Sequence, residues 1–122
     1  LVGHEAQITS AAFNGDGTAI VTASQDSTAR LWDARTGRQR AVLSGHDWHV
    51  LDAGFSPDGK RVVTASADQT ARLWNATTGA FIGVLGGHQG SVTSARFNTA
   101  GNLVVTTSWD GFVRLFDVAT LE

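Results

Sequence analysis

The sequence predicts an all-β protein built from three copies of one four-stranded antiparallel unit. Apolar runs of about five residues, rich in Val, Ile, Thr and aromatics, follow one another along the chain. Turn-forming Gly, Asn, Asp and Pro separate the runs, and the whole pattern returns every 42 residues. No segment offers the 10–12 residues of 3.6-residue periodicity that a helix requires. The 122 residues therefore correspond to three units less four residues.

Each element of the unit is recognised by its apolar run and by the turn that ends it. The first unit predicts strands at Ile8–Phe13, Ala19–Ser24, Thr28–Asp33 and about Arg38–Leu43. In the turns between them, Gly can adopt positive φ, and Asn and Asp side chains can hydrogen-bond to the nearby backbone. These turns are Asn14-Gly15-Asp16-Gly17, Gln25-Asp26-Ser27 and Ala34-Arg35-Thr36-Gly37.

The 42-residue period runs without insertion or deletion. It relates Gly3-His4 to Gly45-His46 and Gly87-His88, and it also relates Phe, Ser, Asp and Arg positions of the three units. Units 1–42 and 43–84 share 21 of 42 positions, whereas unit 85–122 is more divergent. Because the third unit ends four residues early, we expect it to lack its outer strand.

Composition excludes several classes of function. With no Cys, there are no disulfides, thiolate metal sites or Cys nucleophiles. A net charge of −2 gives no basic footprint for nucleic acid or an acidic membrane surface. The chain shows no signal peptide and no apolar stretch long enough to span a membrane. We expect a cytoplasmic protein, of bacterial origin, that binds neither nucleic acid nor membrane.

A unit of this length with Gly-His near its start and Trp-Asp near its end resembles the WD40 repeat. The matching residues run from Gly3-His4 to Trp32-Asp33, and from Gly45-His46 to Trp74-Asn75. In the third copy they run from Gly87-His88 to Phe116-Asp117. The resemblance covers essentially the whole chain and implies blades of a β-propeller. Asn75 replaces the Asp of the motif, and Phe116 replaces the Trp together with its indole N–H.

One His, one Ser and one Asp recur in every unit at constant spacing. Such a trio suggests a hydrolase, which we keep as a remote alternative. An active site occurs once, however, and no Gly-x-Ser-x-Gly elbow is present. The resemblance instead implies structural tetrads completed by Trp, with the third weakened because Phe116 cannot donate to Ser108. The expected tetrads are His4, Ser24, Asp26 and Trp32; His46, Ser66, Asp68 and Trp74; and His88, Ser108, Asp110 and Phe116.

We expect neither a metal nor a cofactor. His4, His46 and His88 lie one per unit around a ring, and His46 and His49 share no helical face, so no set of three or four ligands converges. The glycine-rich turns lack the Gly-x-x-x-x-Gly-Lys pattern that binds phosphate.

The resemblance also implies a partner-binding face, on the edge of the blades that carries Gly-His and the turn before the repeated Asp. Trp109 and Trp48 are the strongest candidates, because their counterparts in other units are Gln, Ala or Gly and the fold does not require an aromatic residue there. Each could anchor a partner or fill a local gap, and both interpretations stay open. The candidate residues are Trp109, Trp48, His49, Gln25, Ala67, Glu5, Asp47 and Gln89.

Three blades cannot close a propeller, which needs four or more. An open array would expose the apolar faces of its first and last blades. We therefore expect head-to-tail assembly with copies of itself, two giving six blades and three giving nine. The resemblance implies that the chain acts as a non-catalytic scaffold for protein interaction. The alternative is a purely structural propeller segment, natural or engineered, without a ligand.

Overall fold

The computed structural model describes residues 1–122 and contains eleven strands and no helix. The predicted all-β class is confirmed, and the observed strands agree with those predicted for the first unit to within one residue. The strands are β1 (Ile8–Phe13), β2 (Ala19–Ser24), β3 (Ala29–Asp33), β4 (Gln39–Leu43), β5 (Val50–Phe55), β6 (Arg61–Ser66), β7 (Ala71–Asn75), β8 (Phe81–Leu85), β9 (Val92–Phe97), β10 (Leu103–Ser108) and β11 (Val113–Asp117).

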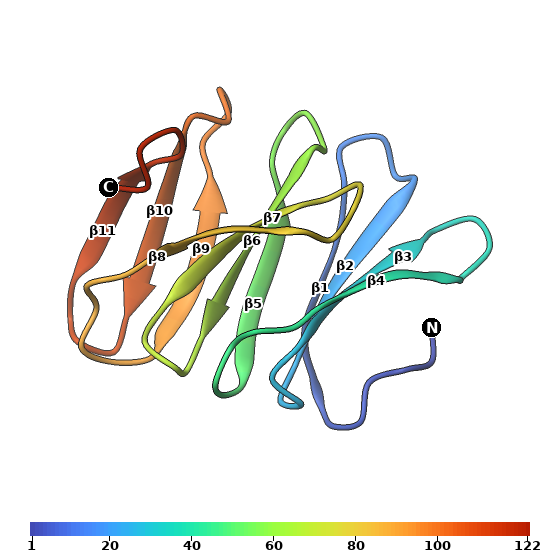
Figure 1. Cartoon of the computed structure of the whole chain (residues 1–122), viewed down its shortest axis with the longest axis horizontal. Helices are drawn as coiled ribbons and strands as arrows, with labels where there is room; N and C mark the ends of the chain where they lie inside the picture. The colour runs from blue at the N-terminus through green and yellow to red at the C-terminus, as the bar shows by residue number, and fades with distance from the viewer.

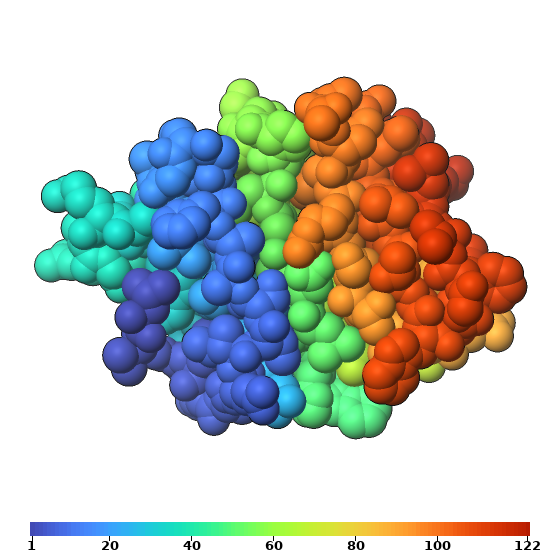
Figure 2. Space-filling model, turned by 180° about the vertical axis from the view of Figure 1, so that it is seen from behind, coloured from blue at the N-terminus to red at the C-terminus, as the bar shows by residue number.

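The strands form three separate antiparallel sheets, here called blades 1, 2 and 3. Blade 1 has the order β1-β2-β3-β4 and blade 2 the order β5-β6-β7-β8, whereas blade 3 contains only β9, β10 and β11. The outer strand is therefore missing from blade 3, as expected. The blades fan out in chain order, with the N-terminus beside blade 1 and the C-terminus beside blade 3 (Figure 1). Their inner strands β1, β5 and β9 lie side by side (Figure 2).

The turn that should lead into the missing strand is nevertheless formed. In blades 1 and 2 it contains Gly37 and Gly79 at positive φ, and in blade 3 the same position holds Leu121 at φ 65°. The Leu121 N–H bonds to the Asp117 carbonyl at 2.8 Å, and the Asp117 N–H bonds to the Glu122 carbonyl at 2.7 Å. Glu122 thus makes the first contact of a fourth strand.

The hydrophobic core consists of two clusters, one at each junction between blades. Each cluster has ten buried residues, and adding 42 to every number of the first gives the second. The first contains Val21, Ala23, Ala29, Leu31, Leu43, Val50, Ala53, Val62, Trp74 and Ala76; the second contains Val63, Ala65, Ala71, Leu73, Leu85, Val92, Ala95, Val104, Phe116 and Val118. The two junctions are therefore built from the same packing unit.

The glycine of each Gly-His pair makes room for an arginine. A Cβ placed on Gly3 would lie 2.7 Å from Nη1 of Arg30, and one on Gly45 would lie 2.8 Å from Nη1 of Arg72. These separations are too short for a carbon–nitrogen contact, so a larger residue at either position would displace the arginine head group. Arg30 and Arg72 are thus half-buried against these glycines, whereas Arg114 of blade 3 is exposed.

Candidate functional site

One histidine of each blade is held by one aspartate on the edge that carries the β2–β3, β6–β7 and β10–β11 turns. We call this edge the His rim; it is the lower edge in Figure 1. The distance from His Nδ1 to Asp Oδ2 is 2.8 Å in all three pairs: His4–Asp26, His46–Asp68 and His88–Asp110. The six side chains are almost fully buried. The sequence-predicted His and Asp are therefore brought together in every blade.

The hydroxyl partner of the histidine is threonine, which corrects the expectation of serine. His4 Nε2 lies 2.6 Å from Thr22 Oγ1, and Trp32 Nε1 donates to the same oxygen at 2.9 Å. In antiparallel pairing Trp32 lies opposite Ile20, so Thr22 is two residues further along the same face. Ser24 is four residues further, roughly 13 Å along the strand, and is out of reach of the indole.

Blades 2 and 3 repeat this arrangement. Thr64 lies 2.7 Å from His46 Nε2 and accepts from Trp74 Nε1 at 2.9 Å. Thr106 lies 2.7 Å from His88 Nε2. With a proton on Nδ1, each neutral imidazole donates to its aspartate and accepts from its threonine, which satisfies the whole chain of hydrogen bonds. A sequence signal for this role existed, because Thr22, Thr64 and Thr106 also recur at 42-residue intervals.

The serines fasten the inner strand to the turn that follows β2, β6 or β10. Ser24 Oγ donates to the Gln7 carbonyl at 3.0 Å and accepts from the Asp26 N–H at 3.1 Å. Ser66 does the same with the His49 carbonyl and the Asp68 N–H. Ser108 bonds to the Gly90 carbonyl and the Asp110 N–H. No serine hydrogen-bonds to a histidine imidazole, so the Ser–His contact of a hydrolase triad is not formed.

The environment of each buried aspartate lowers its pKa. Burial raises the pKa of Asp68, but the hydrogen bonds from His46, from the Thr70 hydroxyl and from the Asp47 N–H lower this pKa by a larger amount. For Asp26, burial is likewise outweighed by bonds from Thr28, His4 and the Glu5 N–H. Asp110 follows the same pattern, with bonds from the Gln89 and Phe112 N–H groups and from His88. The three carboxyl groups are therefore ionised at neutral pH.

Blade 3 lacks two of the donors present in the other blades. Phe116 stands where Trp32 and Trp74 donate an indole N–H, so Thr106 loses that partner; this replaces the expectation that Ser108 loses it. Phe112 stands where Thr70 donates its hydroxyl to the aspartate at 2.6 Å. The second loss was missed from sequence because the role of Thr28 and Thr70 was not recognised.

The candidate partner-binding residues lie along the His rim, and two are prominently exposed. Trp109 is 81% exposed and Trp48 is 57% exposed. His49 contacts the Trp48 ring edge-on, with centroids 5.6 Å apart. The backbone N–H groups of Glu5, Asp47 and Gln89 are held by the repeated aspartates. Gln25 and Ala67 are half-buried and bond through their N–H groups to the carbonyls of Gln7 and His49.

Blades 1 and 3 each expose, on the face that has no neighbouring blade, apolar residues whose equivalents are buried at the two junctions. On blade 3, Leu115 is 63% exposed, whereas its equivalents Leu31 and Leu73 are 1% and 0% exposed. On blade 1, Phe13 is 66% exposed, whereas Phe55 packs against the first core cluster. The expectation of open apolar faces is confirmed.

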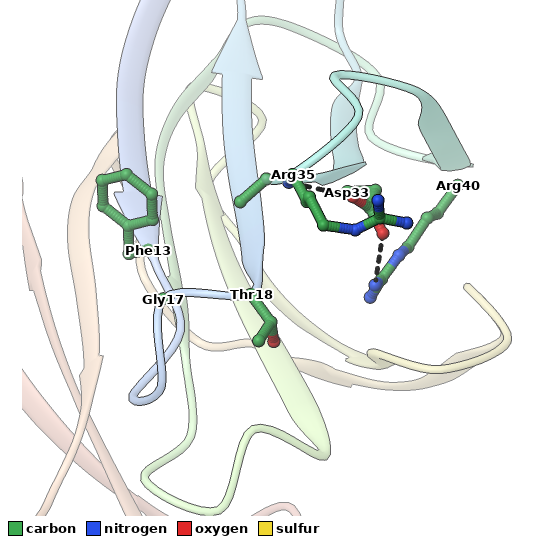
Figure 3. Close-up of a pocket in the computed structure, with 7 residues that line it drawn as sticks. Phe13, Gly17, Thr18, Asp33, Arg35 and Arg40 are labelled. Atoms are coloured by element: carbon green, nitrogen blue, oxygen red, sulfur yellow. Dashed lines mark hydrogen bonds and ion pairs between the residues drawn. The ribbon is translucent and has the colours of Figure 1, made fainter.

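The open face of blade 1 contains a shallow hollow of about 470 Å³ (Figure 3). Phe13 and Ala34 provide its apolar wall, and Arg40 pairs with Asp33 at 3.2 Å across it. Ala76, the counterpart of Ala34 in blade 2, is buried against blade 1. The hollow therefore corresponds to the place that a preceding blade would fill. The sequence pointed to the open face but not to this hollow.

No group of three or more His, Asp or Glu side chains is arranged to hold a metal ion. No helix long and apolar enough to cross a bilayer is present.

Three similar antiparallel blades, each fastened by a His–Asp–Thr chain of hydrogen bonds, define an open β-propeller array. The family model described as WD domain, G-beta repeat matches residues 1–33, 37–75 and 79–117. The chain therefore belongs to the WD40-repeat family. No curated protein sequence matches it. WD40 propellers generally act as non-catalytic scaffolds for protein interaction, which agrees with the serines bonding to backbone groups and not to an imidazole.

Proposed function

We propose that the chain is a protein-interaction scaffold that closes into a homo-oligomeric ring by head-to-tail contact of its own copies. The observation that carries the proposal is the repetition of the two junctions at a step of 42 residues. Blade 3 exposes Val105, Val113 and Leu115, which are equivalent to the residues that blades 1 and 2 contribute to a junction. Blade 1 exposes Ile8 and Phe13, equivalent to the receiving residues.

Contact between blade 3 of one copy and blade 1 of the next would repeat an existing interface. Such a contact joins two different surfaces, so it closes a ring when the rotation per copy allows it. Burying a half-exposed Leu or Phe contributes about 1–2 kcal/mol each, and several such residues meet at every junction. Two copies give six blades and three give nine.

Light scattering tests the assembly directly. A single chain has a mass of 12.8 kDa, so rings of two or three copies have masses of about 26 or about 38 kDa. Leu115→Asp and Phe13→Asp each place a charge on one face only, and each should give monomers. Val84→Asp, at a 40% exposed position on the outer strand β8, is the matched control and should leave the mass unchanged.

Mixing the two single-face variants sharpens the test. Leu115→Asp keeps an intact blade 1 face, and Phe13→Asp keeps an intact blade 3 face. A head-to-tail interface therefore predicts a one-to-one pair with a single junction in the mixture. A stable, cooperatively folded wild type that stays at the monomer mass would overturn the assembly.

Partner binding is proposed for the His rim, with Trp109 and Trp48 as anchors. Trp is enriched among the residues that dominate binding energy, and both side chains stand exposed where other repeats carry small or polar residues. If they serve binding, Trp109→Ala and Trp48→Ala should each change the free energy of unfolding by less than about 0.5 kcal/mol. A loss well above that in urea denaturation would assign them to packing and favour a purely structural segment. The cytoplasmic, bacterial setting stays a prediction from sequence.

A further inference from the structure

The apolar cores of the two junctions do not distinguish one blade from another. Eight of the ten positions hold the same residue in both clusters; only Trp74 and Ala76, against Phe116 and Val118, differ. As a receiving blade, blade 1 offers Ile8, Ala11, Ile20, Trp32 and Ala34 where blade 3 offers Val92, Ala95, Val104, Phe116 and Val118. Both sets are apolar, so blade 2 could also bury its face against blade 1 of a second copy. Polar residues at the junction can discriminate between the two.

The inner strands carry the polar residues that differ between blades. Equivalent positions hold Ser10 in blade 1, Asp52 in blade 2 and Ser94 in blade 3. Two residues further, the positions hold Ala12, Gly54 and Arg96. The chain thus contains one acidic and one basic residue at these six positions, on neighbouring blades.

Asp52 and Arg96 meet across the junction of blades 2 and 3. Asp52 is buried, and its Oδ2 pairs with Nη1 of Arg96 while accepting the Ala95 N–H at 3.3 Å. Its Oδ1 accepts from Ser10 of blade 1 at 3.2 Å. A Cβ on Gly54 would lie 3.5 Å from Nη1 of Arg96, so glycine leaves space for the guanidinium to reach over β5. One carboxylate therefore joins all three blades.

We propose that Asp52 and Arg96 are the specificity-determining pair that selects blade 3 as the partner of blade 2. Blade 1 of another copy presents Ala12 at the position of Arg96, and this docking leaves the buried carboxylate without a cation. Removing the partner of a buried charge is strongly unfavourable, even where the pair itself adds little stability. The pair leaves the contact of blade 3 with blade 1 as the junction that a second copy can form. This part of the inference rests on the proposed head-to-tail assembly.

Disulfide trapping reads out which blade docks on blade 2, since the chain has no cysteine of its own. Leu121 of blade 3 lies against Gly83 of β8, and the equivalent Gly79 of blade 2 lies over Ala41 of β4. Gly83→Cys with Leu121→Cys therefore traps correct docking within one chain. Gly37 is the residue of blade 1 equivalent to Leu121, so Gly37→Cys with Gly83→Cys traps blade 1 of a second copy on blade 2. Leu121 shows that this position accepts a side chain at positive φ.

The test compares both cysteine pairs with and without Asp52→Ser and Arg96→Ala, the residues that the other blades use. We expect the 83–121 link to form fully in the parent, and the 37–83 link between chains to rise about tenfold in the doubly neutralised protein on non-reducing gels. Asp58→Ser with Lys60→Ala, which removes one charge of each sign from exposed sites, is the control and should leave both yields unchanged.

An unchanged 37–83 yield together with an unchanged 83–121 yield would overturn the inference. The yield of the 83–121 link is measured within one chain, so it tests the pair even if light scattering finds the wild type monomeric. A monomeric mass with an altered 83–121 yield would reject the ring and keep the role of the pair. A ring mass with unaltered yields of both links would keep the ring and reject the role of the pair.

Discussion

Blades 2 and 3 contain the same His–Asp pair but differ in what surrounds it. In blade 2 the hydrogen bonds extend from the indole of Trp74 through Thr64 to His46 and Asp68, and Thr70 adds a hydroxyl. In blade 3, Phe116 and Phe112 remove the two end donors. The His-to-Asp distance is nevertheless 2.8 Å in both blades. The centre of the network therefore keeps its geometry without its ends.

The same two replacements change the chemical character of the rim. Phe112 is 64% exposed and lies three residues from Trp109 in the β10–β11 turn, where blade 2 has the smaller Thr70 and Ala67. Blade 3 thus exchanges internal hydrogen bonds for an apolar rim. The stability of the blade and the proposed partner binding at the His rim make opposite demands on these positions, and the comparison of blades 2 and 3 separates the two.

Acidification should produce the largest effect, because it acts on Asp26, Asp68 and Asp110 together. Each pKa is lower in the folded protein than its usual value of 3.8, so the unfolded chain binds more protons at acid pH. The stabilisation is complete above the unfolded pKa and is lost as the pH falls toward the folded value. The urea midpoint should decline from about pH 5 to pH 3 and continue to fall below that.

Asn variants check the source of this decline. Asp68→Asn and Asp110→Asn should each make the midpoint less dependent on pH in that window, at the cost of lower stability at neutral pH. An unaltered slope in both variants would show that other carboxyl groups cause the acid sensitivity. Asp47→Asn, on the exposed rim, should leave the slope nearly unchanged.

Removing the aspartate of blade 2 should cost more than removing that of blade 3. Asp68→Ala leaves donors from His46, Thr70 and the Asp47 N–H without an acceptor, and we expect a loss of about 2–4 kcal/mol at neutral pH. Asp110 has one donor fewer, so Asp110→Ala should cost less than Asp68→Ala. Equal losses in urea denaturation would contradict the difference assigned to the two blades.

Exchanging the aromatic residues tests the indole donor. Trp74→Phe should lower the free energy of unfolding by about 1–2 kcal/mol, because it removes a buried hydrogen bond and leaves space around the ring. The reverse change needs two substitutions, since the second cluster combines Phe116 with Val118 where the first combines Trp74 with Ala76. We expect Phe116→Trp with Val118→Ala to gain about 1 kcal/mol. Phe116→Trp alone should gain less, since it crowds Val118.

The repeat unit made the fold predictable from sequence, whereas the hydrogen-bond partners needed three-dimensional information. Strands and turns follow from local patterns, and the recurring His and Asp lie 2.8 Å apart in every blade. Ser24 and Thr22 recur with the same regularity, so periodicity alone could not decide which hydroxyl reaches the histidine. Only the pairing of Trp32 with Ile20 decides it. The Asp52–Arg96 contact could not be predicted from periodicity, because neither residue recurs in the other units.

Restoring the threonine of blade 3 should give the smallest effect. Phe112→Thr allows a hydroxyl to donate to Asp110, as Thr70 does to Asp68, and an exposed turn limits the gain to about 0.5 kcal/mol. Phe112→Val is the control, because it has the shape of threonine without the donor. A gain shared by both variants would come from strand propensity or from removal of the exposed ring. A gain confined to Phe112→Thr would show that blade 3 gave up this hydrogen bond for an apolar residue at the rim.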